Sequence, residues 1–300
     1  MADQLKEGPV EVESLAKSLN VGVKPLYRIL RTLAAEGVFQ EGAGRKFSLG
    51  EKGQCLRTDL PCSMRNAVVM YGAEQFKAWS NLDSSLTDST TPFEKTYSTP
   101  VFNYFKDHPE SGMNFNKAMK ELGTQIYSDS NIASAYDFKP YSHLIDIGGG
   151  NGSFLKEVLS RSSSDSRGTL FDLPEVVRTF KGEGNISVVG GDFFKSIPAG
   201  GDLYLLKRVL HDWDDDKAIA ILTQVRKAIS DHGKVLLVEY VIEKDSSLAH
   251  WLDLHMMVMT GGYERTDQDF AKIFEKSGFM LNRIIHTKGK LSIIEAGVKR

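Results

Sequence analysis

Residues 143–154 read His-Leu-Ile-Asp-Ile-Gly-Gly-Gly-Asn-Gly-Ser-Phe and carry the clearest structural signal in the chain. A short apolar run ends in Asp146, and several glycines follow, among them Gly148 and Gly150. Apolar residues at helical spacing begin at about residue 153, so the glycines occupy a strand-to-helix turn. Glycine permits positive φ and lets the backbone approach a ligand closely. The segment therefore predicts the first strand-turn-helix unit of a nucleotide-binding, Rossmann-like fold.

The spacing of these glycines favours one kind of nucleotide ligand. Dinucleotide-binding folds carry the pattern G-x-G-x-x-G. This turn reads Asp-x-Gly-x-Gly-x-Gly and lacks the third glycine of that register, which disfavours a nicotinamide-dependent oxidoreductase. The pattern instead resembles the S-adenosylmethionine site of class I methyltransferases. Without a ligand, the same glycines would form only a tight turn.

The next apolar run, residues 168–174, also contains an acidic residue at its end. Asp172 lies a little over twenty residues beyond the glycine turn. A carboxylate at the end of the second strand can accept hydrogen bonds from both ribose hydroxyls of a nucleotide. The alternative is that Asp172 caps the turn before Pro174.

A third apolar run, residues 186–190, leads into a Gly-Asp-Phe-Phe segment. Asp192 is placed to bind an adenine amino group, and Phe193 to pack on the adenine ring. The alternatives are a turn cap for Asp192 and a core position for Phe193. Three successive strands that each end in an acid, at Asp146, Asp172 and Asp192, favour a cofactor site over three separate structural roles.

A fourth apolar run, residues 202–206, is followed by Lys-Arg-Val-Leu-His-Asp-Trp at residues 207–213. His211 thus follows a buried strand. The ordinary pKa of histidine, about 6.5, suits its side chain to take a proton near neutral pH. A lone histidine is more often structural, and the acid-ended strands upstream are what favour a general base here.

The overall composition predicts an intracellular enzyme. The chain has 300 residues, which suggests two domains, and a net charge of -2, which gives no general attraction to nucleic acid or acidic membranes. Its two cysteines, Cys55 and Cys62, form no metal-binding pattern or disulfide framework. The sequence has no transmembrane run and no signal peptide at its N-terminus. We therefore expect a cytoplasmic protein without a membrane partner.

Residues 11–53 show a helix-turn-helix pattern followed by a wing. Helices are predicted over 12–19 and 23–37, and a hairpin with a glycine-rich turn over 38–49. Alone, this pattern is typical of a DNA-binding winged helix. Acidic residues leave the segment nearly neutral without a basic stripe, so we expect no nucleic-acid partner. A winged-helix regulator with a vestigial Rossmann domain is the alternative from another functional class.

Residues 62–120 form an aromatic-rich region that is predicted to be mostly helical, with a loop over 83–92. Its aromatic and methionine side chains are typical of core, and some of them can also roof a pocket for a flat apolar substrate.

From residue 141 onward, predicted strands and helices alternate as in a doubly wound sheet. The remaining predicted elements are helices over 216–230, 248–260 and 266–277, a strand over 234–239, and two last strands over 280–286 and 291–296, the second antiparallel.

Taken together, the chain resembles the plant-type and bacterial small-molecule O-methyltransferases, which include caffeate, flavonoid, acetylserotonin and phenazine O-methyltransferases. The resemblance covers essentially the whole chain. It rests on the motifs at residues 146–152, 171–174, 191–194, 211–215 and 261–266.

The resemblance implies an α/β fold, a Rossmann-like class I methyltransferase domain with an N-terminal helical winged-helix domain. Residues 1–100 would form the winged-helix and helical domain, which serves dimerisation and closes the active site as a lid. Residues 101–300 would form the S-adenosylmethionine-dependent methyltransferase domain. The implied assembly is a homodimer.

The resemblance also implies roles for individual residues. His211 would remove the proton of a substrate hydroxyl as the oxygen attacks the methyl group, with Glu239 and Glu264 flanking it. The implied cofactor-binding residues are Asp146, Gly148, Gly150, Asp172, Leu173, Asp192, Phe193 and Lys207. The implied substrate-binding residues are Asp212, Trp79, Met113, Phe115, Met119, Met256, Met259 and Thr260.

We therefore predict an O-methyltransferase that needs no metal and acts on a small hydroxylated aromatic substrate, phenolic or polyketide-like. S-adenosyl-L-methionine is the predicted cofactor, and S-adenosyl-L-homocysteine the product. A second alternative keeps the fold and the cofactor but catalyses decarboxylation, hydroxylation or a pericyclic step.

Overall fold

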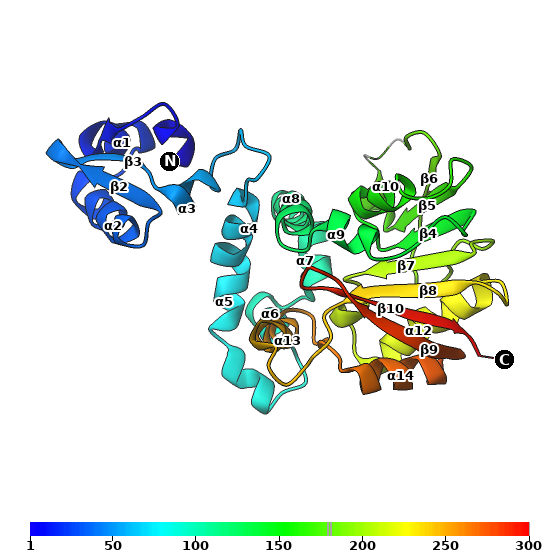
Figure 1. The fold of residues 1–300 in the computed structure, drawn as a ribbon. Helices are drawn as coiled ribbons and strands as arrows, with labels where there is room; N and C mark the ends of the chain where they lie inside the picture. Colours follow the sequence, from blue (N-terminus) through cyan, green and yellow to red (C-terminus); the bar gives the residue numbers. More distant parts are fainter. Residues whose placement is uncertain (179, 181, 300) are drawn as a thin grey trace.

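The structure is a computed structural model that describes residues 1–178, 180 and 182–299. Its C-terminal part is built on a seven-stranded sheet (Figure 1). The strands lie in the order β6-β5-β4-β7-β8-β10-β9, with β4 next to both β5 and β7. Pairing is parallel from β6 to β8, and β10 is antiparallel to both neighbours, as predicted. The strands are β4 (His143–Ile147), β5 (Arg167–Asp172), β6 (Ile186–Gly190), β7 (Leu203–Lys207), β8 (Lys234–Glu239), β9 (Phe279–His286) and β10 (Ser292–Val298).

Both faces of the central strands β4, β7 and β8 are buried, which explains their continuous apolar runs. Successive residues of β4 and β7 alternate between two hydrophobic clusters: Leu144 and Leu205 belong to one, Ile145 and Leu206 to the other. The helices that follow the strands are α10 (Ser153–Leu159), α11 (Pro174–Val177), α12 (Asp215–Ala228), α13 (Ser247–Met259) and α14 (Asp267–Lys276).

Local capping explains where two of these helices begin. The Asp214 side chain accepts a hydrogen bond from the Lys217 backbone N–H at 2.8 Å and so starts α12. Thr266 and Asp269 form a reciprocal capping box at the start of α14. The predicted helices are therefore present, with ends that differ by one or two residues.

A helical region lies between the sheet and the N-terminal unit (Figure 1). The predicted loop over 83–92 is wrong in its first part, where η4 (Leu82–Leu86) forms a 3-10 helix. A π-helical turn, η3 (Tyr71–Gln75), joins α4 to α5. The helices of this region are α4 (Arg65–Met70), α5 (Phe76–Trp79), α6 (Pro92–Tyr97), α7 (Val101–Asp107), α8 (Pro109–Gln125) and α9 (Asp129–Ser134).

The N-terminal unit has its own hydrophobic core, which includes Leu15, Leu30 and Phe47. Its three strands pair in the order β1-β3-β2, all antiparallel, beside two helices. This unit stands apart from the sheet and joins the helical region through the chain after α3 (Figure 1). Its elements are η1 (Ala2–Leu5), β1 (Val10–Glu11), α1 (Val12–Leu19), α2 (Val23–Ala35), β2 (Phe39–Gly42), η2 (Ala43–Arg45), β3 (Lys46–Leu49) and α3 (Glu51–Gln54).

The expected domain boundary at residue 100 falls between α6 and α7, inside the helical region. In the described part of the chain, no helix has the length and apolarity that crossing a membrane requires.

Candidate active site

The candidate residues gather at the carboxyl ends of the parallel strands. Asp146 is in β4, Asp172 ends β5, Lys207 ends β7 and Glu239 ends β8. In a parallel sheet these ends share one edge, which is where doubly wound folds bind their ligands.

The glycine turn after β4 has the backbone conformation that its sequence predicts. Gly148 and Gly150 have φ of 66° and 57°, in the left-handed region. The Asp172 carboxylate accepts a hydrogen bond from the backbone N–H of Gly150 at 2.8 Å and another from that of Leu173 at 2.7 Å. Asp172 thus fixes the turn.

Asp146 lies beneath this turn and is 1% exposed. A Cβ on Gly149 would come within 2.6 Å of its carboxylate, so only glycine fits there. Among the described residues, neither carboxylate oxygen has a hydrogen-bond partner. Burial raises the pKa of Asp146 to about 7, although Lys207 counteracts this rise. Asp146 is therefore a buried acid without a fixed partner.

Lys207 makes an ion pair that the sequence did not reveal. Its Nζ lies 2.7 Å from Asp129 Oδ1, and Ser153 donates a hydrogen bond to the other Asp129 oxygen at 3.2 Å. Asp129 is in α9, outside every motif used above, so no local signal marked it.

Side chains of the Gly-Asp-Phe-Phe segment also make contacts within the protein. Asp192 accepts a hydrogen bond from the Phe194 backbone N–H at 3.0 Å and lies 3.5 Å from Lys195. Phe193 packs edge-on against Trp213 with ring centroids 6.0 Å apart. Trp213 also packs edge-on against Phe194, with ring centroids 4.9 Å apart.

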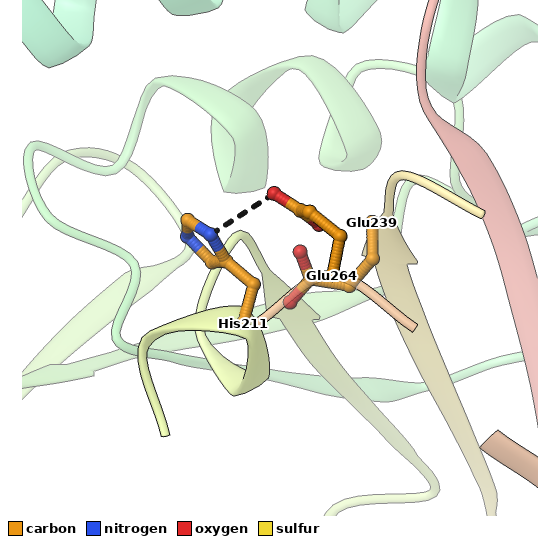
Figure 2. Close-up of side chains that lie close together, drawn as sticks. All are labelled: His211, Glu239 and Glu264. Atoms are coloured by element: carbon orange, nitrogen blue, oxygen red, sulfur yellow. Dashed lines mark ion pairs between the residues drawn. The ribbon is translucent and has the colours of Figure 1, made fainter. Parts of the chain in front are cut away.

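His211, Glu239 and Glu264 point toward one another (Figure 2). They come from η5 (Leu210–Asp212), from β8 and from the loop after α13. His211 Nδ1 lies 3.3 Å from Glu264 Oε1, and all three side chains are buried. The structure thus brings the predicted histidine and its two acids together.

Glu239 contacts the histidine turn through the backbone. Its Oε1 accepts hydrogen bonds from the N–H groups of Val209 at 3.0 Å and Leu210 at 2.9 Å. Glu264 is the acid that contacts the imidazole, and Glu239 is the acid that holds the turn carrying it.

Arg208 completes this cluster and was missed from the sequence. Its Nη1 lies 2.7 Å from Glu264 Oε1 and 3.6 Å from Glu239 Oε2, and its guanidinium faces the ring of Tyr240 at 5.0 Å. Its backbone φ is 57°, which local sequence does not predict for arginine. His211, Glu239 and Glu264 offer ligand atoms within 4.8 Å of one another, but Arg208 already supplies positive charge beside both carboxylates.

The charges of the cluster set the proton affinity of the histidine. Burial lowers the pKa of His211, as does Arg208, but Asp212, Glu264 and Glu239 outweigh both and raise it above 6.5. Burial alone would raise the pKa of Glu264, yet Arg208 and His211 hold it far below its usual value. Glu264 is therefore an anion that favours the protonated imidazole.

Arg265 clamps the turn that carries His211. It is 1% exposed and donates hydrogen bonds to the carbonyl oxygens of Leu210 at 2.9 Å and Trp213 at 2.8 Å. A Cβ on Gly262 would overlap the carbonyl oxygen of His211, so the Gly-Gly break lets this loop approach the turn. In the Glu-Arg-Thr motif at residues 264–266, Glu264 therefore contacts the imidazole of His211, and Arg265 binds the backbone of the turn that carries His211.

Of the four predicted substrate residues in the aromatic-rich region, Phe115 and Met119 pack against other apolar side chains. Phe115 stacks on Phe105 with centroids 4.7 Å apart and contacts Phe102 edge-on. Phe102 in turn stacks on Trp213 at 6.1 Å, which links this cluster to the histidine turn. Met119 packs against the core on one face of the sheet.

The other predicted substrate residues differ in their burial. Met256 and Met259 lie in α13 and are buried. The Thr260 hydroxyl donates a hydrogen bond to the Met256 carbonyl oxygen. Met113 is 56% exposed, so its side chain lies outside the buried site. Trp79 donates a hydrogen bond to His255 Nδ1 at 3.0 Å. His255 was missed, although it lies in the predicted helix 248–260.

Known proteins with the same fold match the chain over its length. A family model of the O-methyltransferase domain matches residues 79–280. The phenazine O-methyltransferase PhzM of Lysobacter antibioticus is 40% identical over 305 residues, which cover 99% of this chain and 89% of that protein. The crystal structure of LaPhzM has a TM-score of 0.94 at 38% identity and covers 99% of this chain and 91% of its own.

A further crystal structure contains ligands. NcsB1, an O-methyltransferase from neocarzinostatin biosynthesis in complex with S-adenosylmethionine and 2-hydroxy-5-methyl naphthoic acid, has a TM-score of 0.86 at 28% identity. The match covers 99% of this chain and 92% of NcsB1.

These matches confirm the family resemblance and the class I methyltransferase fold. Because these relatives are methyltransferases by name, non-methylating chemistry is not favoured. NcsB1 has also been solved in complex with S-adenosyl-L-homocysteine. The chain belongs to the O-methyltransferase family, and it is an S-adenosylmethionine-dependent O-methyltransferase that yields S-adenosylhomocysteine.

Proposed function

We propose that the protein methylates a hydroxyl of a small aromatic substrate, phenolic or polyketide-like, with His211 as general base. The observation that carries this proposal is the buried contact of 3.3 Å between His211 Nδ1 and Glu264 Oε1. The aromatic character of the substrate rests on relatives that are named for phenazine methylation or hold a hydroxynaphthoic acid.

The geometry gives the two imidazole nitrogens different tasks. We assign the N–H to Nδ1, which lies 3.3 Å from the Glu264 carboxylate, and the lone pair that takes the substrate proton to Nε2. Nε2 lies 3.2 Å from the Arg208 carbonyl oxygen and 3.7 Å from Asp212 Oδ1. Both oxygens favour the N–H that forms, so the site stabilises the imidazolium product of the proton transfer.

The reaction balances without a further reactant. The substrate oxygen gives its proton to His211 and its electron pair to the new O–CH₃ bond, while the C–S bond of the methyl donor breaks. A phenol has a pKa of about 10, so its deprotonation at neutral pH needs a base. General base catalysis contributes about 10²–10⁴ in rate. Alignment of oxygen and methyl group contributes roughly 7–11 kcal/mol and is the larger effect.

The cofactor site proposed here fits the groups at the sheet edge. Positive-φ glycines let the backbone approach a ligand closely, and Asp146 offers a buried carboxylate that has no hydrogen-bond partner in the described part of the chain. When bound, the cofactor supplies the methyl group on a sulfonium cation, which an acidic site favours. We assign cofactor contacts to Asp146, Gly148, Gly150, Asp172, Leu173, Asp192, Phe193 and Lys207. Asp129 joins this set through its ion pair with Lys207.

We also propose that the enzyme is a homodimer whose N-terminal unit is a winged helix that serves dimerisation and closes the site. Large apolar side chains are exposed on α4, α5 and α13, and Phe76 and Trp251 are 69% and 62% exposed. Such surfaces mark protein interfaces. Nucleic acid is not a proposed partner. The cytoplasmic location and the boundary at residue 100 stay predictions.

The test is methyl transfer from labelled S-adenosylmethionine to a panel of phenols, with formation of S-adenosylhomocysteine measured in parallel. His211→Ala should lower kcat by about 10²–10⁴, and His232→Ala, an exposed histidine, is the matched control. Full activity of His211→Ala on an accepted substrate would show that His211 is not the base.

A further inference from the structure

Asp253 contacts the proposed site through the backbone of Glu264. Its Oδ1 accepts a hydrogen bond from the Glu264 N–H, eleven residues further along the chain, at 2.9 Å. The Asp253 side chain is half-buried and comes from α13, the helix that precedes the Gly-Gly loop. It lies outside the sequence motifs at residues 211–215 and 261–266. A helix face thus binds the loop that carries one of the acids of the site.

Other contacts hold the loop on either side of Glu264. Before it, the Gly262 N–H donates to the Thr260 hydroxyl at 3.2 Å, and a Cβ on Gly262 would overlap the backbone of η5. After it, the Arg265 carbonyl oxygen accepts a hydrogen bond from the Ile242 N–H at 2.9 Å. The loop is therefore attached at both ends, and the bond from α13 fixes the peptide between them.

The position of this peptide matters because Glu264 meets two groups with one atom. Its Oε1 lies 2.7 Å from Arg208 Nη1 and 3.3 Å from His211 Nδ1. The backbone N–H is one bond from the Glu264 Cα, so a partner on it restricts rotation of the segment that carries the carboxylate. In active sites a displacement of about 1 Å can lower the rate about 10²-fold.

We propose that Asp253 is a positioning residue for methyl transfer, whose carboxylate holds the Glu264 backbone so that Oε1 reaches His211 and Arg208 together. In this role Asp253 acts through Glu264 and needs no contact with substrate or cofactor. The inference rests on the proposed function, because it takes the contact between Glu264 and His211 to serve the base.

A double-mutant cycle with Glu264 tests this role, with 1-hydroxyphenazine as the probe substrate. Asp253→Leu removes the acceptor and keeps a side chain branched at the same carbon. It should lower kcat by about 10–10²-fold and leave KM for the probe nearly unchanged. In Glu264→Ala the backbone N–H remains, but no carboxylate is left to position. Asp253→Leu should therefore cause no further loss of kcat in that background.

Stability measurements separate positioning from a merely structural role. The Glu264 N–H loses its partner in both backgrounds, so Asp253→Leu should lower Tm by a similar amount in each. Asp253→Asn keeps an acceptor oxygen and should restore most of kcat, although an uncharged acceptor binds more weakly. Asp216→Leu, an exposed aspartate of α12, is the matched control and should leave kcat nearly unchanged. An equal factor of loss in kcat in both backgrounds would mean that Asp253 only stabilises the fold.

Nitrogen-15 NMR titration of the His211 imidazole needs no substrate. Glu264 is one of the acids that raise the pKa of His211, so its displacement in Asp253→Leu should lower this pKa. An unchanged pKa in that variant would overturn the proposal, whatever the activity. If the pKa falls but His211→Ala keeps full methyl transfer, the base assignment fails and the placement of Glu264 by Asp253 stands. If His211→Ala is inactive but Asp253→Leu changes neither the pKa nor kcat, the base stands and Asp253 has no positioning role.

Discussion

The charged side chains around the His211 imidazole set the pKa of this proposed base. Arg208 Nη1 lies 2.7 Å from Glu264 Oε1, and this positive charge keeps the carboxylate ionised beside His211. Arg208 opposes protonation of the histidine, while the acids favour it, and the acids prevail. His211 is therefore tuned to hold the proton it takes, which a residue of ordinary pKa would do less well.

The raised pKa of His211 predicts the pH dependence of the reaction. The base must be neutral to act, so kcat/KM should rise with pH through a value above 6.5. Asp212 is the strongest of the acids that raise this pKa, and its Oδ1 lies 3.7 Å from Nε2. Asp212→Asn should therefore shift the acid limb of the pH profile to lower pH. An unchanged limb in this variant would contradict the assignment of that limb to His211.

The buried carboxyl group of Asp146 is expected to lower the stability of the fold at neutral pH, although we assign it to cofactor binding. Its pKa is raised to about 7 by burial, so its ionisation in the folded state disfavours folding as pH rises from 3.8 to about 7. Asp146→Asn should therefore raise the free energy of unfolding by roughly 1–4 kcal/mol at pH 8 and by little at pH 4. The same variant should bind S-adenosylhomocysteine more weakly.

Urea unfolding at the two pH values measures the stability difference of this variant. The exposed Asp165→Asn is the control. A gain in stability that is equal at pH 4 and pH 8 would rule out the ionisation of Asp146 as its cause.

At the scale of elements, the turn η5 is held from two sides. β8 binds its backbone N–H groups through Glu239, and the loop before α14 binds its carbonyl groups through Arg265. A short helical turn of three residues has little stability of its own, so these contacts determine where His211 lies.

Arg265→Lys should disturb this turn while it preserves the charge. Lysine lacks the fork that reaches two carbonyl oxygens and Asp215 together, so we expect a loss of about 2–4 kcal/mol in stability and at least tenfold in kcat. Thermal unfolding and steady-state kinetics measure the two effects. Arg161→Lys, in a half-exposed pair with Glu157, is the control and should change either by little. Normal kcat in Arg265→Lys would show that the turn does not depend on this clamp.

At the scale of the whole molecule, the N-terminal unit and the sheet have separate hydrophobic cores and are joined by helices (Figure 1). The helical region between them exposes apolar side chains, notably Val68, Phe76 and Trp251. α5 also carries Trp79, so a partner that covers these helices would lie close to a residue that we assign to substrate binding.

The homodimer proposal predicts that a charge on this surface breaks the assembly. Phe76→Glu and Trp251→Glu should each convert a dimer into a monomer in sedimentation experiments, because the interface cannot bury an unpaired carboxylate. Methyl transfer should fall in the monomer if the partner closes the site. Met280→Glu, on the edge strand β9, should leave the assembly intact. A monomeric wild type would refute the proposal.

The sequence by itself predicted the strands of the large sheet, most of the helices and the antiparallel last strand, because apolar runs, glycine turns and helix caps act within a few residues. It also placed Asp146, Asp172, Lys207 and Glu239 at one edge, since parallel strands share their carboxyl ends.

Only the tertiary structure decided which side chains meet. Lys207 pairs with Asp129 across 78 residues, and Trp79 binds His255 across 176. Arg208 faces both glutamates through a backbone conformation that its residue type disfavours. Spacing along the chain reports local geometry and burial, whereas these contacts depend on how distant elements pack. They give His211 its charge environment and hold His255 against Trp79.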